Sequence, residues 1–317
     1  MAILGATGHI GKGLVRELAG NTDYHLGLFV RDHAAMASHM EIVGAGAQNY
    51  DILELSDFGN SSNDIVINAI GAGDPARLAA LGHGIFRLTE DFDNLILEHL
   101  ERYPDVLYLN FSSGAVYGAG FSSPPTAETR FNVAVNDLPT SQHYGLAKLY
   151  AEAKHRAHGD LNIVDLRVFS YFSQFIDLSG RFFMADLVRC LIAEKVFVTN
   201  DLDFVRDFIV PADLALMIDC CVAAWKKSSG VPVNCGLDFY SKKPAGKFEL
   251  IDQIRDIFPF EYQIEKTADT LTATGAKSHY ASEFKKAGAW GYAPCFTTTE
   301  GVISEARRLL EKSSRGA

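Results

Sequence analysis

The chain has 317 residues and a mass of 34.7 kDa, which predicts about two domains, or one large α/β domain with an appendage. Apolar residues make up 48% of the chain and charged residues 21%, so it can bury a sizeable core as a soluble globular protein. The 39 acidic residues outnumber the 29 Lys and Arg residues, the net charge is −10, and no basic block occurs. This balance argues against nucleic acid and anionic membranes as partners, whereas a few placed Arg residues can still bind a small anion.

The five cysteines include no C-x-x-C pair and no Cys/His metal-ligand spacing, so we expect reduced thiols in the cytoplasm and no metal site. Met1 is followed directly by an apolar run without a charged leader, which predicts no secretory signal. The longest apolar stretch, residues 208–225, is interrupted by Pro211, Asp213 and Asp219, which excludes a membrane span.

Short apolar runs alternate with helical patterns in the first half of the chain, which predicts a parallel sheet flanked by helices. Strands are expected at residues 2–4, 25–30, 47–51, 64–70, 106–111 and 161–169. Helices are expected at residues 10–18, about 84–103 and 141–158. Beyond Ser170 the pattern is irregular, with a helix expected at 182–195, a strand at 205–210, a helix ending near Trp225, and a final helix that Thr297 and Glu300 open as a capping box.

A glycine-rich turn lies between the first expected strand and the first helix. Gly5, Gly8 and Gly11 form a G-x-x-G-x-x-G pattern, in which glycine permits a tight turn and the helix N-terminus faces a pyrophosphate. The alternative is a glycine-rich turn kept only for packing. In this context the pattern predicts a dinucleotide site made by Gly5, Thr7, Gly8, His9, Ile10 and Gly11.

The residues that follow the next strands bear on which dinucleotide is bound. NAD enzymes place an acid about 20 residues beyond the last glycine, whereas NADP enzymes place an arginine there. Arg31 holds this position and Asp32 follows it, so NADP(H) is favoured over NAD(H), unless Arg31 is merely solvated. Further cofactor contacts are expected after the third and fourth strands, from Asp51, Ile52, Ala69, Ile70 and Gly71.

A Y-x-x-x-K pattern at Tyr144 and Lys148 indicates proton-transfer chemistry. On a helix the two side chains lie one turn apart on one face, so the ammonium group can lower the pKa of the tyrosine toward the working range. Two other pairs in the chain match this spacing, so the spacing alone does not identify the catalytic pair. Tyr144 is favoured by its position, because it opens a helix that can face Ser113 at the end of the fifth strand. His155, on the same helix, is expected to be exposed.

Together the motifs resemble those of the extended short-chain dehydrogenase/reductases, specifically the NAD(P)-dependent nucleotide-sugar epimerase/dehydratase group, over nearly the whole chain. The landmarks occur in family order: G-A-T-G-H-I-G, S-S-G-A-V-Y-G, Y-G-L-A-K, L-R-V-F and R-D-F-I-V-P-A-D-L-A. The resemblance implies that Ser113 is the catalytic hydroxyl, Tyr144 the base, and Lys148 its partner, which also holds the nicotinamide ribose.

Substrate contacts are expected from five residues: Ser113, Tyr117, Ser170, Arg181 and Arg206. The resemblance implies that Arg206 grips the diphosphate of a nucleotide-linked sugar. Two alternatives stay open, namely that Arg206 is a surface or salt-bridged residue and that Tyr117 only closes its loop.

The sequence departs from the family pattern at two places. Sugar 4,6-dehydratases of this group carry an Asp-Glu pair directly after the catalytic hydroxyl, where this chain has Gly114 and Ala115. Without a group to protonate the departing hydroxyl, dehydration is disfavoured. Members of the family often have Asn after the L-R-x-F strand, where this chain has Ser170, so the local substrate contacts differ.

The resemblance implies an α/β fold, a doubly wound parallel Rossmann sheet with a smaller α+β substrate lobe. We expect residues 1–169 and about 203–225 to form the NAD(P)-binding domain, and residues about 170–202 and 226–317 to form the lobe. The resemblance also implies a homodimer built through the helices at about 84–103 and 141–158.

The expected function is epimerisation or reduction of a nucleotide-linked sugar, by proton transfer through Tyr144 and hydride transfer through NAD(P). One alternative is reduction of a non-nucleotide ketone or aldehyde, for which Arg206 would meet no diphosphate. Another is a non-catalytic NAD(P)-sensing protein, against which the intact Ser113, Tyr144 and Lys148 set argues.

Overall fold

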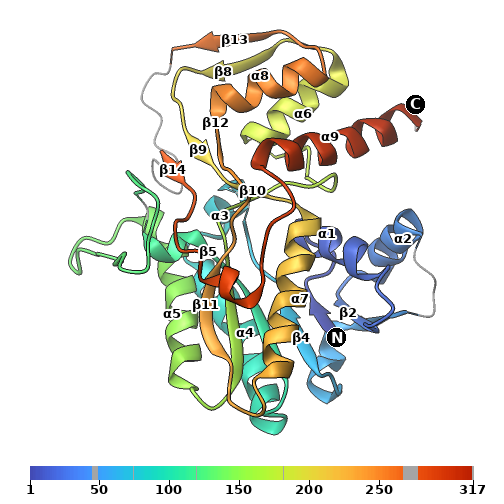
Figure 1. Cartoon of the computed structure of the whole chain (residues 1–317), viewed down its shortest axis with the longest axis vertical. Helices are drawn as coiled ribbons and strands as arrows, with labels where there is room; N and C mark the ends of the chain where they lie inside the picture. The colour runs from blue at the N-terminus through green and yellow to red at the C-terminus, as the bar shows by residue number, and fades with distance from the viewer. Residues whose placement is uncertain (45–48, 74, 119, 181, 267–277, 316–317) are drawn as a thin grey trace.

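Seven parallel strands form the main sheet in the computed structural model of Figure 1, which describes residues 1–44, 49–73, 75–118, 120–180, 182–266 and 278–315. Their order is β3-β2-β1-β4-β5-β6-β11, so the strand order reverses between β1 and β4. Ligands bind outside the carboxyl ends of parallel strands at such a reversal. The strands are β1 (Ala2–Leu4), β2 (Leu26–Val30), β3 (Tyr50–Glu54), β4 (Ile65–Asn68), β5 (Leu107–Ser113), β6 (Asn162–Val168) and β11 (Asn234–Asp238).

Helices cover both faces of this sheet. One face carries α1 (His9–Leu18), α2 (His33–Val43) and α7 (Pro211–Lys227), and the other carries α4 (Gly84–Arg102) and α5 (His143–Ala157). Strand side chains alternate between the faces: Ile65 and Ile67 of β4 join the first core, whereas Val66 joins the second. The predicted doubly wound α/β fold is therefore confirmed.

Three further helices, α6 (Phe183–Ala193), α8 (Lys247–Ile257) and α9 (Thr298–Arg315), build a smaller lobe with the paired strands β8 (Phe197–Asn200) and β13 (Tyr262–Glu265). The lobe has its own apolar core, which includes Leu187, Leu250 and Val302. In Figure 1 it lies beyond the upper edge of the main sheet.

Five short strands form two small sheets, with orders β12-β9-β14 and β10-β7. They are β7 (Ser170–Tyr171), β9 (Val205–Arg206), β10 (Phe208–Ile209), β12 (Ala245–Gly246) and β14 (His279–Tyr280). The remaining helical segments are α3 (Pro75–Leu81) and the 3-10 helices η1 (Leu55–Asn60), η2 (Gly114–Tyr117), η3 (Thr140–Gln142) and η4 (Lys286–Trp290).

The structure corrects two of the predicted strands. The third strand, expected at residues 47–51, begins at Tyr50 and ends at Glu54. The strand expected at 205–210 is two short strands in different sheets, because Asp207 between them turns inward and accepts hydrogen bonds from Ser241 N and Thr298 Oγ1. The capping box that opens the last helix is confirmed, since Glu300 N donates to Thr297 Oγ1 at 3.2 Å and Thr297 N donates to Glu300 Oε2 at 2.8 Å.

One strand of the main sheet lies in the range that the sequence assigned to the lobe. Strand β11 pairs in parallel with β6 along five residues and closes that edge of the sheet. At its centre Gly236 lets the guanidinium of Arg167 lie across the strand, because a Cβ atom there would lie 2.6 Å from Arg167 Nη2. Apart from this strand, the proposed division of the chain into two parts stays a prediction.

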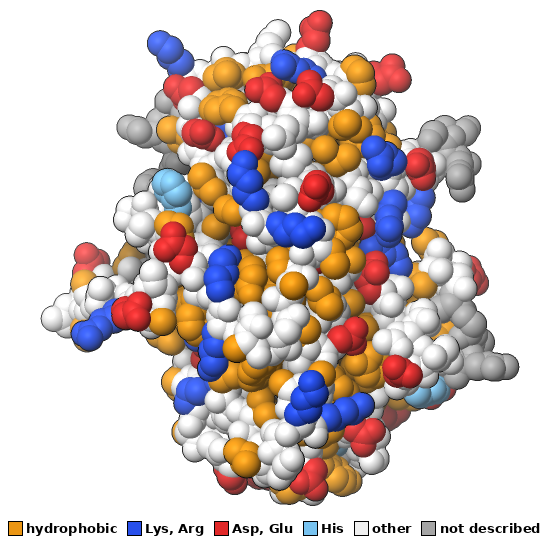
Figure 2. Space-filling view, in the orientation of Figure 1, with side chains coloured by type: hydrophobic (Ala, Val, Ile, Leu, Met, Phe, Trp, Pro, Cys, Tyr) orange, Lys and Arg blue, Asp and Glu red, His pale blue; other side chains and the backbone are white. Residues whose placement is uncertain are grey.

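Acidic and basic side chains are interspersed over the face shown in Figure 2. Within the described part of the chain, no helix is both long enough and apolar enough to cross a bilayer.

Candidate active site

The glycine turn between β1 and α1 is held by close backbone contacts. Gly5 has a φ of +82°, and a Cβ atom there would lie 2.8 Å from the carbonyl carbon of Ala69. A Cβ atom at Gly11 would lie 2.3 Å from the carbonyl oxygen of Gly5. Gly8 caps α1 in an extended conformation, with Thr7 and Ile10 partly buried beside it. The turn thus places the N-terminus of α1 at the carboxyl edge of the sheet, a position that suits a dinucleotide pyrophosphate.

His9 connects this turn to the segment that follows β6. Its ring lies 4.8 Å from the ring of Tyr171, and burial lowers the pKa of His9 to about 4, so the imidazole is neutral at neutral pH. Tyr171 in turn packs against α1 at Gly13, where a Cβ atom would lie 1.9 Å from the tyrosine hydroxyl. The N-terminal half of α1 therefore packs against Tyr171.

Other predicted cofactor residues lie along the same edge. Arg31 follows β2 directly and is exposed, while Asp32 accepts a hydrogen bond from Ala35 N at 2.9 Å and caps α2. Ala69, Ile70 and Gly71 follow β4, and the loop they form lies against the turn at Gly5.

The structure contradicts the expected position of Asp51 and Ile52. They are the second and third residues of β3 rather than the residues after it, and Asp51 pairs with His25, which precedes β2, at 2.7 Å. Glu54 is the residue that lies opposite Val30 at the carboxyl end. The cause is the register of β3, which starts three residues later than the apolar pattern indicated, so Asp51 lies near the amino edge of the sheet.

Ser113 and Tyr144 meet where β5 ends and α5 begins. A Cβ atom at Gly145 would lie 2.4 Å from the carbonyl oxygen of Ala115, so glycine allows α5 to lie directly on the turn that follows Ser113. Burial raises the pKa of Tyr144, and a hydrogen bond with Ser113 partly offsets this rise. Ser113 and Tyr144 are thus close enough to form a hydrogen bond at this edge, as the sequence predicted.

Lys148 lies one turn further along α5 and is 5% exposed. Its Nζ donates to the carbonyl oxygen of Phe111 at 2.8 Å and lies 4.0 Å from the position a Cβ atom would take at Gly71. Burial lowers the pKa of Lys148, although nearby carboxylates oppose this. The sequence predicted that Lys148 lowers the pKa of Tyr144, but in this structure burial dominates and the pKa of Tyr144 is raised.

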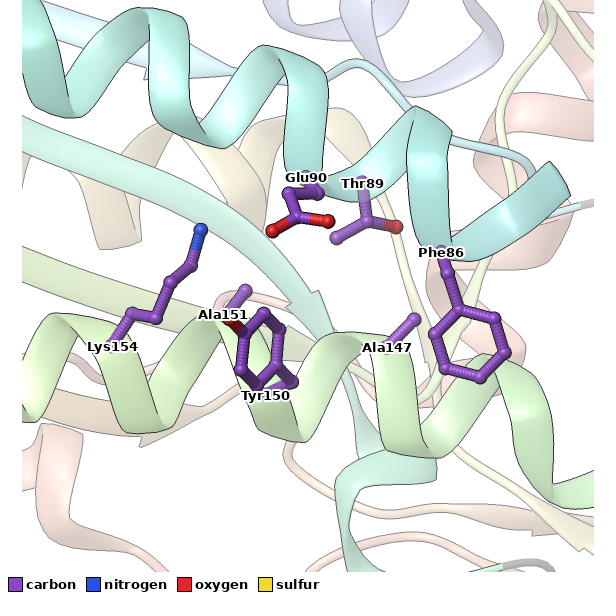
Figure 3. Close-up of a pocket in the computed structure, with 7 residues that line it drawn as sticks. All are labelled: Phe86, Thr89, Glu90, Ala147, Tyr150, Ala151 and Lys154. Atoms are coloured by element: carbon purple, nitrogen blue, oxygen red, sulfur yellow. The ribbon is translucent and has the colours of Figure 1, made fainter.

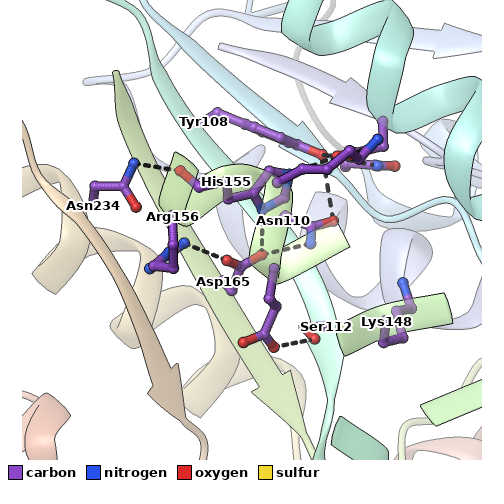
Figure 4. Close-up of polar contacts among 12 residues, drawn as sticks. Tyr108, Asn110, Ser112, Lys148, His155, Arg156, Asp165 and Asn234 are labelled. Atoms are coloured by element: carbon purple, nitrogen blue, oxygen red, sulfur yellow. Dashed lines mark hydrogen bonds and ion pairs between the residues drawn. The ribbon is translucent and has the colours of Figure 1, made fainter. Parts of the chain in front are cut away.

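A buried ionic network joins α5 to α4 and β6 through His155, Asp93 and Asp165. Figure 4 shows His155 and Asp165 with their polar neighbours. His155 is fully buried, with Nε2 2.7 Å from Asp93 Oδ1 and Nδ1 2.8 Å from Asp165 Oδ1. Burial alone would lower the pKa of His155, but the two carboxylates raise it to about 9. The expectation that His155 is exposed was wrong, because α5 turns this residue toward the polar side chains of β5 and β6 rather than toward solvent.

The predicted substrate residues occupy different surroundings. The Tyr117 hydroxyl donates to Asp238 Oδ2 at 3.0 Å and accepts from Arg167 Nη1 at 2.7 Å, so it belongs to a polar network beside the site. Ser170 lies on β7, opposite Phe208. Arg181 lies outside the described residues.

Arg206 lies between two aromatic rings. Its guanidinium carbon is 4.4 Å from the ring centroid of Phe204 and 5.8 Å from that of Tyr280. Burial lowers the pKa of Arg206 to about 10, so the group keeps its positive charge at neutral pH. A cation held this way offers donors to an anionic ligand on the lobe side of the site.

The residue that sequence reasoning missed is Tyr280. Its hydroxyl lies 3.1 Å from Ser113 Oγ, and Tyr280 stands directly opposite Arg206 in the pairing of β14 with β9. The two hydroxyl-bearing residues are 167 positions apart. No motif in the sequence surrounds Tyr280, so only the tertiary fold reveals it.

Three comparisons place this geometry among known proteins. The model of the NAD dependent epimerase/dehydratase family matches residues 1–236. No curated protein gives a sequence match. Many solved structures share the fold, and three of them illustrate its range.

A UDP-glucose 4-epimerase from Thermotoga maritima, solved with UDP-glucose, has a TM-score of 0.76 and 17% identity, over 99% of this chain and 100% of that chain. An epimerase from Stenotrophomonas maltophila, solved with NAD and formylated UDP-arabinopyranose, has a TM-score of 0.77 and 18% identity, over 100% and 99%. A dTDP-glucose 4,6-dehydratase from Bacillus anthracis, in complex with NAD, has a TM-score of 0.75 and 16% identity, over 99% and 97%. At these identities the likeness concerns the fold.

Proposed function

The chain belongs to the NAD dependent epimerase/dehydratase family, and we propose that it is an epimerase or keto-sugar reductase acting on a nucleotide-linked sugar. The observation that carries the proposal is the meeting of Ser113 and Tyr144, with Lys148 one turn away, beside the glycine turn. On this proposal, the residues that transfer the proton and those that bind the dinucleotide lie at the same edge of the sheet.

Two residues of the chain would act on the same oxygen atom of the substrate. Tyr144 exchanges a proton with the sugar hydroxyl or carbonyl oxygen, and Ser113 donates a hydrogen bond to that oxygen. Lys148 holds the nicotinamide ribose, and we propose that its charge opposes the burial that raises the pKa of Tyr144. The close contacts at Gly5 and Gly11 fit a dinucleotide whose pyrophosphate lies against the N-terminus of α1. When bound, the nicotinamide supplies or accepts the hydride.

The cofactor proposed is NAD(P), with NADP(H) favoured. Arg31 is exposed at the end of β2, where a 2′-phosphate would lie. The neighbouring carboxylate of Asp32 is engaged with the backbone of α2, which supports Arg31 as the residue that meets the ribose.

Dehydration at the sugar is disfavoured by the surroundings of Gly114. The ring of Phe169 lies where a side chain would project, since a Cβ atom at position 114 would lie 2.5 Å from Phe169 Cδ1. An acid at this position, as in the 4,6-dehydratases of the group that the sequence resembles, would displace that ring.

A homodimer is proposed to form through α4 and α5. A groove of about 140 Å³ lies between these helices, lined by Phe86, Thr89, Glu90, Ala147, Tyr150, Ala151 and Lys154 (Figure 3). Phe86 is 37% exposed and Tyr150 is 53% exposed, so each presents an aromatic ring that a second copy could cover.

The test of the proposed function is ligand-induced thermal stabilisation followed by a turnover assay. The protein is titrated with NAD, NADH, NADP and NADPH, each alone and with UDP-, GDP-, CDP- and dTDP-sugars. Stabilisation by a dinucleotide and further by one sugar nucleotide, with conversion of that sugar, supports the proposal. Stabilisation by no dinucleotide would refute it.

Arg206→Ala separates the nucleotide-sugar proposal from reduction of a simple ketone or aldehyde. If Arg206 meets a diphosphate, the variant loses sugar-nucleotide stabilisation and keeps dinucleotide stabilisation. Unchanged affinity for the converted substrate would favour the non-nucleotide alternative. Binding of both ligands without turnover would favour a sensing protein.

A further inference from the structure

We propose that Tyr280 is a positioning residue for the reaction, whose hydroxyl directs the proton of Ser113 toward Tyr144 and the substrate oxygen. This inference rests on the proposed function, because it assigns Tyr280 a part in the same site. Tyr280 comes from β14, at the border of the lobe, so the lobe would supply a group that orients the hydroxyl at the end of β5.

The ring of Tyr280 is fixed by aromatic packing. It is 7% exposed, and its centroid lies 5.0 Å from that of Phe121 and 5.1 Å from that of Phe169. Packed this way the ring has little freedom to turn. The hydroxyl is therefore held at 3.1 Å from Ser113 Oγ by contacts that do not depend on that hydrogen bond.

The hydrogen bonds at Ser113 allow Tyr280 to donate the shared bond, and the proposed role of Ser113 requires it. A serine hydroxyl has one hydrogen and two lone pairs. One lone pair accepts Ala115 N at 3.2 Å. If Tyr280 donates to the second lone pair, the hydrogen of Ser113 is left for Tyr144 or the substrate oxygen. If Ser113 donated to Tyr280 instead, neither Tyr144 nor the substrate could receive it.

The protonation of Tyr280 agrees with this assignment. Burial raises the pKa of Tyr280 well above its ordinary value, although Ser113 and Arg206 partly oppose the rise, so the phenol keeps its proton. The charge of a tyrosinate at position 144 raises it further. Tyr280 therefore keeps the hydrogen that the proposed bond to Ser113 requires.

Tyr280→Phe tests the inference, because it removes the hydroxyl and retains the ring that packs against Phe121 and Phe169. We expect kcat to fall about tenfold or more, while KM for the sugar nucleotide and the Kd of the dinucleotide stay unchanged. We also expect the pKa that governs kcat to move to higher pH, because the Tyr144 phenolate loses an oriented donor. An unchanged pH profile would overturn the proposal.

Tyr292→Phe is the matched control. The Tyr292 hydroxyl is buried in the same C-terminal segment and donates to the carbonyl oxygen of Tyr240 at 3.0 Å. A purely structural effect of losing one buried hydroxyl should lower the melting temperature in both variants. Only Tyr280→Phe should shift the pH profile.

A measurement without substrate keeps this inference separate from the proposed function. The Tyr144 ring is followed by NMR during a pH titration, with its signal assigned by comparison with Tyr144→Phe. An upward shift of the Tyr144 pKa in Tyr280→Phe supports the positioning role even if no sugar nucleotide is converted. The same Tyr144 pKa in both proteins would overturn it, whatever the activity.

Discussion

Gly145 lies directly against the carbonyl oxygen of Ala115, so closely that a Cβ atom at position 145 would lie 2.4 Å from it. This contact joins the first turn of α5 to the turn that follows β5. Because Tyr144 precedes Gly145 and Ser113 precedes that turn, the missing side chain sets how near the two candidate catalytic groups come.

The variant Gly145→Ala should therefore separate Tyr144 from Ser113. The added methyl group meets backbone that cannot rotate away, so we expect a loss of about 1–3 kcal/mol in the free energy of unfolding and a larger fractional loss of kcat. Chemical denaturation and initial rates measure the two effects. Gly159→Ala is the control, since a Cβ atom there meets nothing within 4 Å. Full activity in Gly145→Ala would show that the close approach is unnecessary.

Replacing Arg31 should reduce the preference of the protein for NADPH over NADH. Losing a charge-assisted contact with a 2′-phosphate costs about 1.5–3 kcal/mol, so Arg31→Ala should weaken NADPH binding by about ten- to hundredfold and leave NADH binding unchanged. Isothermal titration calorimetry measures both constants. Arg31→Lys, which keeps the charge, should retain much of the NADPH affinity. Equal losses for both dinucleotides would contradict the proposed role.

The buried network around His155 should make stability depend on pH. The folded pKa of about 9 lies above the ordinary value of 6.5, so the stabilisation is fully present below about pH 6.5 and is lost as the pH rises through about 9. His155→Leu removes the charged partner that the two buried carboxylates share, while Lys154 still pairs with Asp93 and Arg156 with Asp165. We therefore expect it to cost about 1.5–3 kcal/mol at neutral pH. Urea unfolding across this range measures both effects.

The control for that measurement is His158→Leu, because His158 lies at the end of the same helix and is only partly buried. It should leave the alkaline loss of stability in place. A His155→Leu protein as stable as the wild type would contradict the charged network.

The proposed dimer should depend on the exposed rings of α4 and α5. Tyr150→Glu places a charge on the proposed contact, so sedimentation velocity should show a shift from dimer toward monomer. Ile264→Glu changes a side chain that is 51% exposed on the lobe and should leave the dimer intact. A wild-type monomer, or a dimer unaffected by Tyr150→Glu, would exclude this interface.

Local patterns predicted most of the sheet. Strand β4 reads as a continuous β-branched run because it is buried on both faces, and the turn from Gly5 to Gly11 follows a strand and opens a helix as its spacing indicates. Tyr144 and Lys148 were recognisable because helical spacing places them on one face of α5.

Features set by tertiary contacts were missed. Strand β11 contains Asn, Gly and Asp and carries no clear alternation, and it is a strand because β6 pairs with it. The burial of His155 follows from partners on two other elements, α4 and β6. Tyr280 reaches Ser113 only because β14 pairs with β9 at the border of the lobe.

The most direct test of the account is the turnover of Tyr144→Phe on the sugar nucleotide that the wild type converts. The variant keeps the ring and loses the group that exchanges the proton, so kcat should fall about a hundredfold or more while calorimetry shows unchanged dinucleotide affinity. Full turnover by Tyr144→Phe would contradict the proposed chemistry.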